Sequence, residues 1–221
     1  MPRLGSHRRR LPEILRLLAL AYPDAHCELD FQTPFELLVA TVLSAQCTDR
    51  RVNMVTSRLF PRLTGPKSLV EMGVDRLAEE IRDVGLFRAK ARALVSLSED
   101  LIRLHGGQVP ADRQALEALA GVGKKTASVV LANAFAIPAL AVDTHVFRVS
   151  HRLGLASAKS PEKTAAELME IVPPDDWISF HHQLIAHGRQ VCHARSPACA
   201  TCTLLPLCPD GRRRTASPAV R

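Results

Sequence analysis

Apolar residues recur along this chain every three or four positions, the spacing that places them on one face of an α-helix. The first such face consists of Leu11, Ile14, Leu15, Leu18 and Ala21. Glu13 and Arg16 interrupt this stretch, so it predicts a docking helix and not a secretory leader. No convincing run of alternating apolar and polar residues occurs, and the pattern therefore predicts an all-α fold.

The most apolar predicted helix runs from Phe35 to about Ala45. The preceding Thr33-Pro34 and the following Glu36 combine a capping box with proline at the first helical position. This helix and the one over 125–134 are apolar enough to be buried. Glycine punctuates the rest of the chain and predicts helices over 66–72, 75–84, 87–105, a stretch from Ser160 that ends by Pro173, and 177–187, which Gly188 closes. About ten helices are expected in all.

A tight Gly121-Val122-Gly123 turn separates two helical patterns within residues 112–148. Leu116 and Leu119 belong to the first pattern and 127–134 to the second, so a helix, a hairpin and a helix are predicted. Both glycines are expected to supply unusual backbone angles and to lack the Cβ that would keep a phosphate away. Because the second helix begins with unpaired N–H groups at its positive dipole end, the turn is a candidate anion site.

Lys124 and Lys125 directly follow this turn, where the helix dipole disfavours a cation. Local rules are broken most often at functional sites, and the same environment favours a neutral amine, which is a nucleophile. The alternative is that both lysines are solvated phosphate contacts, as in proteins that only bind DNA. Spacing alone does not decide between these interpretations.

Asp143 lies in the segment Ala141-Val142-Asp143-Thr144-His145, just before another helical pattern. It is an N-cap candidate, and a capping aspartate usually has a structural role. A carboxylate beside an amine nucleophile would also supply acid–base or electrostatic help for covalent catalysis. Asp143 is therefore a candidate for both roles.

Composition narrows the class of partner. With 221 residues, 47% of them hydrophobic, the chain can form one large domain or two small ones. Its 29 Lys and Arg residues exceed its 22 Asp and Glu residues, and the resulting net charge of +7 suits a polyanionic partner. No segment approaches the roughly 20 uninterrupted apolar residues that span a bilayer, so no membrane partner is expected.

Four of the six cysteines form the pattern Cys192-x6-Cys199-x2-Cys202-x5-Cys208. Disulfides are not expected in a chain without a secretory signal, whereas four thiolates in one short loop can enclose a metal centre. One short pair flanked by longer gaps is compatible with either Zn²⁺ or a cubane iron–sulfur cluster. Spacing alone leaves the metal open.

The stretch LAGVGKKTASVV, followed by AVDTHVFRV, resembles the signature of the endonuclease III family, bifunctional DNA glycosylases of the helix-hairpin-helix superfamily. The resemblance implies that Lys125 is the Schiff-base lysine and Asp143 the essential carboxylate. It also implies that the four cysteines hold one [4Fe-4S] cluster, with zinc as the alternative. Ala120 departs from the family, which usually has proline before the Gly-Val-Gly turn, where proline would pre-set the turn.

The same resemblance implies roles for residues outside this motif. Gln46, which by itself is an exposed amide at a helix end, matches a glutamine that wedges into the duplex and fills the gap left by the extruded nucleotide. Leu86, which by itself is a helix-end hydrophobic contact, matches a residue that probes the strand opposite the lesion. The further expected DNA contacts are Gly121, Val122, Gly123, Lys124, His145, Arg189 and Arg195.

Two all-α lobes are expected. A six-helix lobe over 28–137 contains the hairpin, and residues 1–27 join 138–221 in a second lobe that carries the cysteine loop. DNA is expected between the lobes, with Lys125 and Asp143 facing each other. The basic segments at about 1–10 and 210–221 are expected to be disordered tails with nonspecific DNA affinity.

Three functions are compatible with these patterns. The leading hypothesis is a base-excision-repair glycosylase that removes oxidised pyrimidines from double-stranded DNA and cleaves the abasic site by β-elimination through a lysine Schiff base. The second is a monofunctional glycosylase of the same fold, such as the adenine–mismatch type, which generally lacks a lysine at position 125. The third is a noncatalytic DNA-binding subunit, against which the coexistence of Lys125 and Asp143 argues. A monomer in the cytoplasm is expected.

Overall fold

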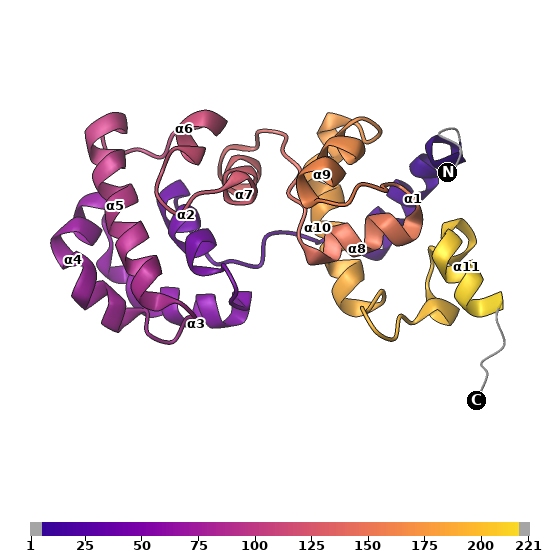
Figure 1. The fold of residues 1–221 in the computed structure, drawn as a ribbon, viewed down its shortest axis with the longest axis horizontal. Helices are drawn as coiled ribbons and strands as arrows, with labels where there is room; N and C mark the ends of the chain where they lie inside the picture. The colour runs from indigo at the N-terminus through magenta and orange to yellow at the C-terminus, as the bar shows by residue number, and fades with distance from the viewer. Residues whose placement is uncertain (1–5, 217–221) are drawn as a thin grey trace. The chain divides into compact units, whose positions relative to one another are not determined.

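The computed structural model describes residues 6–216, which divide into two compact units (Figure 1). The central unit is Cys27–Ile137, and the terminal unit combines the described residues before Cys27 with those from Pro138 onward. Every regular element among the described residues is a helix, and no strand occurs there. The predicted all-α fold is therefore confirmed.

Six α-helices build the central unit. They are α2 (Pro34–Leu43), α3 (Asp49–Leu59), α4 (Pro66–Glu80), α5 (Phe87–His105), α6 (Arg113–Glu117) and α7 (Lys124–Phe135). In this unit α4 packs along α5, while α2 packs against α3, α5 and α7 (Figure 1). The hairpin helix α7 is thus supported by the most apolar helix of the unit.

Helix α2 begins and packs as its sequence predicts. The Thr33 side chain accepts the N–H of Glu36 at 3.2 Å, and the Glu36 carboxylate accepts the N–H of Gln32 at 2.6 Å, so two N–H groups at the helix start are satisfied. From Phe35 to Leu43 every side chain except Glu36 is buried. The helix ends at Leu43, slightly earlier than expected.

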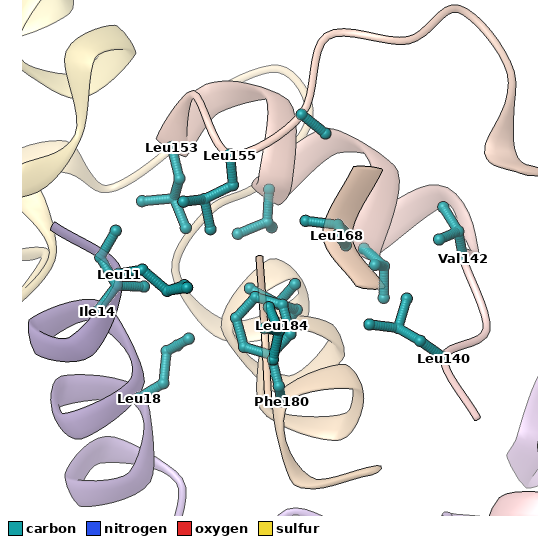
Figure 2. Close-up of a cluster of buried hydrophobic side chains, with 14 of the residues drawn as sticks. Leu11, Ile14, Leu18, Leu140, Val142, Leu153, Leu155, Leu168, Phe180 and Leu184 are labelled. Atoms are coloured by element: carbon teal, nitrogen blue, oxygen red, sulfur yellow. The ribbon is translucent and has the colours of Figure 1, made fainter. Parts of the chain in front are cut away.

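The terminal unit has five α-helices among the described residues. They are α1 (Ser6–Ala21), α8 (Thr144–Leu153), α9 (Pro161–Met169), α10 (Trp177–Gln190) and α11 (Pro209–Ala216). Figure 2 shows its core, in which Leu11, Ile14 and Leu18 of α1 belong to one cluster with Phe180 and Leu184 of α10. The apolar face of α1 is buried against α10, which confirms the predicted docking helix. Complete burial of one such side chain contributes about 1.5–3 kcal/mol.

Gly73 and Gly188 affect their helices differently. Helix α4 spans Pro66–Glu80, but its backbone is non-helical at Gly73, where φ is 75°, so two helical segments meet at a kink at the residue where the sequence predicts a helix end. Helix α10 continues past Gly188 to Gln190, so the predicted end at Gly188 is wrong. A Cβ on Gly188 would lie 2.9 Å from His145 Nδ1 and 3.1 Å from Arg148 Nη2. Glycine at 188 therefore makes room for α8 and does not terminate α10.

The basic segments are also more ordered than predicted. Arg8, Arg9 and Arg10 lie within α1, and the arginines at 212–214 lie within α11, so the prediction of disordered tails is wrong for these residues. The Arg10 guanidinium donates to the carbonyls of Leu153 and Leu207, which fixes it to the terminal unit. The remainder of both predicted tails, 1–5 and 217–221, lies outside the described residues.

No helix within residues 6–216 is both long enough and apolar enough to cross a membrane.

Candidate functional site

The hairpin turn connects α6 to α7 in the central unit. Gly121 has a φ of 76°, and a Cβ there would lie 3.0 Å from the Ala93 Cβ, so both conformation and space require glycine. Gly123 has a φ of −98° and open space around it, so the special backbone conformation predicted for Gly123 is wrong. Val122 is buried and its N–H donates to the Leu119 carbonyl at 3.1 Å, which anchors the turn.

Helix α7 begins without a side-chain cap. Gly123 occupies the N-cap position, and the first backbone bond of the helix runs from the Ala127 N–H to the Gly123 carbonyl at 2.9 Å. The N–H groups of Lys124, Lys125 and Thr126 therefore have no acceptor within the helix. Both lysine side chains are exposed beside them. An anion placed at this turn would meet backbone donors and two lysine side chains.

Two further predicted DNA contacts lie together in the same unit. Gln46 follows α2 with a φ of 54°, and Leu86 precedes α5 with a φ of 60°. Both side chains are exposed, and the leucine retains 60% of its accessible surface. A Cβ added to Gly85 would lie 3.8 Å from the Gln46 carbonyl oxygen, so the two loops are neighbours. The structure thus brings together residues that the sequence places far apart.

Asp143 caps α8 in the terminal unit. Its Oδ1 accepts the N–H of His145 at 2.8 Å and that of Val146 at 2.7 Å, which confirms the predicted N-cap. No residue within 6–216 forms a hydrogen bond to Oδ2. The carboxylate is half-buried. Backbone donors therefore hold one oxygen in place while the other is available to a ligand.

His145 connects this cap to the next turn of α8. Arg148 Nη2 lies 3.1 Å from His145 Nδ1 and also donates to the Gly188 carbonyl at 2.9 Å. A guanidinium can only donate, so this contact is a hydrogen bond in the tautomer that carries its proton on Nε2. Burial lowers the pKa of His145; the negative charge of Asp143 and a backbone hydrogen bond with Gly188 oppose this shift, and the positive charge of Arg148 reinforces it. A neutral ring with an N–H donor therefore stands beside the capping carboxylate.

The four cysteines predicted to hold a metal line one cavity in the terminal unit: Cys192, Cys199, Cys202 and Cys208. Four thiol donors around one cavity fit either a zinc ion or an iron–sulfur cluster.

Donors surround three of these sulfurs. Arg152 Nη1 lies 3.3 Å from Cys192 Sγ, and the Gly211 N–H donates to Cys208 Sγ at 3.2 Å. His187 Nε2 lies 3.7 Å from Cys202 Sγ, while its Nδ1 lies 2.9 Å from the Tyr22 hydroxyl. Each of these contacts would stabilise a thiolate, the state that binds metal, whereas burial raises the pKa of Cys202 and Cys208.

The two arginines predicted as DNA contacts near the cysteine loop are both exposed. Arg189 is in the last turn of α10, and Arg195 lies between Cys192 and Cys199. Their positions are compatible with phosphate contacts, and their predicted role is tested only by binding experiments.

Sequence patterns missed several polar residues that organise these features. Arg148 donates through Nε to the Cys192 carbonyl at 3.0 Å, so α8 is tied to the first cysteine. Arg152 donates to the His193 carbonyl at 2.7 Å. Lys90 is buried and reaches two carbonyls near Gln46. The sequence contains only a weak sign of these roles. The three cations fall at helical spacing among apolar residues, and a charged group that is buried there requires a hydrogen-bonding partner.

Comparison with known proteins defines the class first. Residues 39–174 match the HhH-GPD superfamily of base excision DNA repair proteins. This match includes the hairpin, both lysines and Asp143.

Individual relatives then narrow the class. The chain is 46% identical over 196 residues to endonuclease III of Haemophilus influenzae, an alignment that covers 89% of this chain and 93% of that protein. A solved non-covalent endonuclease III–DNA complex superposes with a TM-score of 0.90 and 46% identity, over 95% of this chain and 99% of that one. A solved endonuclease III–DNA complex trapped as a covalent intermediate also superposes with a TM-score of 0.90 and 46% identity. That match covers 94% of this chain and 98% of the other.

The chain belongs to the endonuclease III family. It is a bifunctional enzyme of base excision repair, a DNA glycosylase that also has abasic-site lyase activity, as the sequence predicts.

Proposed function

We propose that this enzyme removes oxidised pyrimidines from double-stranded DNA, with Lys125 as the nucleophile and Asp143 as the assisting carboxylate. The observation that carries this assignment is the exposed Lys125 amine at the uncapped start of α7, directly behind the hairpin turn. A phosphate held by the turn would bring a nucleotide within reach of that amine.

Lys125 and Asp143 divide the reaction between them. The neutral Lys125 amine attacks C1′ of the extruded nucleotide, and the glycosidic C–N bond breaks with its electron pair leaving on the base, which takes up a proton. The free Asp143 oxygen stabilises the positive charge that develops on the sugar. The amine then loses its proton and the sugar ring opens to an imine. Loss of a proton from C2′ expels the 3′ phosphate, and water releases Lys125.

The remaining predicted contacts hold the DNA around this chemistry. The Gly121-Val122-Gly123 turn and Lys124 would bind backbone phosphates, because Gly121, Gly123 and the Lys124 side chain are exposed. Gln46 and Leu86 would insert into the duplex, since both are exposed on neighbouring loops. His145 would donate its Nε2–H near the nucleotide, and Arg189 and Arg195 would contact phosphates beside the cysteine loop.

We also propose that the four cysteines hold one [4Fe-4S] cluster. Their thiolates would each bind one iron, and the cluster would order the loop that carries Arg195. Arg152, His187 and the Gly211 N–H, which already lie beside three of the sulfurs, would then help to neutralise the cluster charge. When bound, the cluster supplies structural order here; the chemistry at the sugar requires only Lys125 and Asp143.

The enzyme is proposed to act as a monomer in the cytoplasm, on the nucleoid of a bacterial cell. Double-stranded DNA that contains damaged bases or abasic sites is its partner. The net charge of +7 supports this assignment because it favours association with the phosphate backbone.

Borohydride trapping tests the nucleophile. The enzyme is incubated with duplexes that each contain one oxidised pyrimidine, and borohydride reduces any imine to a stable protein–DNA adduct. The wild type should form the adduct, whereas Lys125→Gln should form none although it still folds and binds DNA. Strand cleavage at abasic sites by Lys125→Gln would contradict the imine mechanism at this residue.

Lys124→Gln is the matched control, because it removes the neighbouring exposed lysine. This variant should still be trapped. It should bind DNA more weakly. The slope of log affinity against log salt concentration should also become shallower by about one, as expected for the loss of one phosphate contact.

A further inference from the structure

Lys90 is the only buried lysine, arginine, aspartate or glutamate within residues 9–216, with 6% of its surface exposed. Its Nζ donates to the carbonyls of Leu43 and Ala45, each at 2.7 Å. No carboxylate of the described chain pairs with it. A buried ammonium without an anionic partner is costly, so its retention requires a specific benefit.

The side chain of Lys90 fixes the turn that carries Gln46. Leu43 is the last residue of α2, and Ala45 directly precedes Gln46. The Leu43 carbonyl belongs to the unsatisfied end of the helix, where the dipole favours a cation, and the Ala45 carbonyl lies just beyond it. The turn then places Gln46 at a φ of 54°, a left-handed conformation that is unfavourable for a non-glycine residue. The ammonium therefore holds a backbone segment that would otherwise relax.

The backbone of the same residue fixes the loop that carries Leu86. The Lys90 N–H donates to the Leu86 carbonyl at 3.0 Å and forms the first turn of α5. Leu86 has a φ of 60° and no side-chain cap, so it too has an unfavourable conformation. Its neighbour Gly85 lies against the Gln46 carbonyl. One residue thus binds one loop through its side chain and the other through its main chain.

We infer that Lys90 is a positioning residue for damage recognition, which sets the separation and conformation of Gln46 and Leu86 so that both enter the duplex together. This inference rests on the proposed insertion of those two side chains. Preorganisation of both loops before binding avoids the cost of ordering them on the DNA. The benefit should be specific to DNA that has a gap to fill.

The test compares affinities for two duplexes of one sequence, one undamaged and one with a tetrahydrofuran abasic analogue. Lys90→Met keeps the length of the side chain and removes the charge. Its preference for the abasic analogue should fall about tenfold, equivalent to about 1.4 kcal/mol, with little change on undamaged DNA. Gln46→Ala and Leu86→Ala, measured alongside, should each reduce the same preference.

Two controls separate positioning from stability. Ser98→Ala removes another buried hydrogen bond of α5, from Ser98 Oγ to the Leu94 carbonyl at 2.7 Å, two turns beyond Lys90. It should lower the melting temperature and leave the preference unchanged. Lys90→Arg retains a buried cation should Lys90→Met fail to fold; its wider head should displace the two carbonyls and reduce the preference less than methionine does.

If Lys90 serves stability alone, its variants should melt at lower temperatures but keep the preference for the abasic analogue. This result would overturn the inference. The reduced preference of Gln46→Ala and Leu86→Ala would then still support the insertion. If neither of those two variants changes the preference, the proposed insertion is wrong and the role of Lys90 is wrong with it. Loss of the preference in all three single variants supports both.

Discussion

Asp143 has two carboxylate oxygens with different surroundings. One accepts two backbone N–H groups at the start of α8, and the other has no hydrogen-bonding partner among residues 6–216. A side chain that only capped the helix would need the first oxygen alone. The arrangement separates the structural role of the residue from its proposed chemical role.

Asp143→Asn should therefore preserve the fold and reduce the reaction. Asparagine caps a helix about as well as aspartate, so the melting temperature should change by no more than a few degrees. The rate of base release should fall by roughly 10²–10⁴, because the amide cannot stabilise positive charge on the sugar. Single-turnover rates and thermal melts of both proteins provide the comparison. If the slower base release is accompanied by a large fall in melting temperature, the residue has a structural role instead.

Single residues could be predicted from sequence where their neighbours along the chain determine their position. The cap by Asp143 and the placement of Lys125 at the start of α7 follow from local patterns. The buried environment of Lys90 does not, because its acceptors Leu43 and Ala45 belong to another helix. The contact between Tyr22 and His187 likewise depends on tertiary packing.

At the level of helices, α8 and α10 approach closely because position 188 has no side chain. A Cβ there would lie 3.0 Å from the Cβ of His145, which cannot move without its helix. Helix starts were well predicted, since Thr33 and Ser160 cap their helices through local bonds. The end predicted at Gly188 was wrong because glycine here serves packing between helices, which a local pattern does not reveal.

Gly188→Ala should destabilise the terminal unit although alanine favours helices. Alanine gains about 1 kcal/mol in helix propensity, whereas overpacking against a rigid neighbour costs about 1–3 kcal/mol. The melting temperature should fall by several degrees, at about 2–4 °C per kcal/mol for a chain of this size. Base release should slow as well, since His145 adjoins the cap of α8. An unchanged or raised melting temperature would show that the helices separate without cost.

Glu167 of α9 supports the segment that follows α8. Its carboxylate accepts the N–H of Ser157 at 2.7 Å and that of Ala158 at 3.0 Å. Partial burial tends to raise the pKa of this carboxyl, but the hydrogen bonds from Ser157 and Ala158 outweigh it and the pKa is lowered overall. A group with a lowered pKa in the folded state stabilises the protein above its unfolded pKa and loses this contribution as the pH falls.

Glu167→Gln should therefore melt at a lower temperature than the wild type at pH 7, and the difference should shrink as the pH falls below about 4. Thermal melts across this range give the measurement. A difference that is constant with pH would show that the charge of Glu167 does not stabilise these bonds.

For the molecule as a whole, the cysteine loop connects α8, α10 and α11 of the terminal unit. The loop follows α10, and Cys208 directly precedes α11. Arg148 and Arg152 of α8 donate to carbonyls of the loop. The spacing of the cysteines indicated a metal centre, but its surroundings could not be predicted because both arginines bind carbonyls about 40 residues further along the chain.

The purified protein should be yellow-brown, and Cys202→Ser should lose this colour with a fall in melting temperature of roughly 5–10 °C, as a loop ordered by metal ligation is released. DNA affinity should also fall, because the loop carries Arg195. Cys27→Ser changes a cysteine outside the loop and should keep the colour. Iron and zinc analysis of both proteins gives the measurement. Colourless protein with one zinc would contradict the iron–sulfur assignment.

The terminal unit is assembled from two separate segments of the chain. Helix α1 packs on α10, and Arg10 binds carbonyls of Leu153 and Leu207. During synthesis α1 leaves the ribosome first, yet its partners are translated last, after the whole central unit. We expect the central unit to fold before the partners of α1 are synthesised, so the apolar face of α1 remains exposed during this time. If the proposed roles hold, a nascent chain therefore completes the hairpin with Lys125 before Asp143 and the cysteine loop are synthesised, so it would bind DNA before it would cleave it.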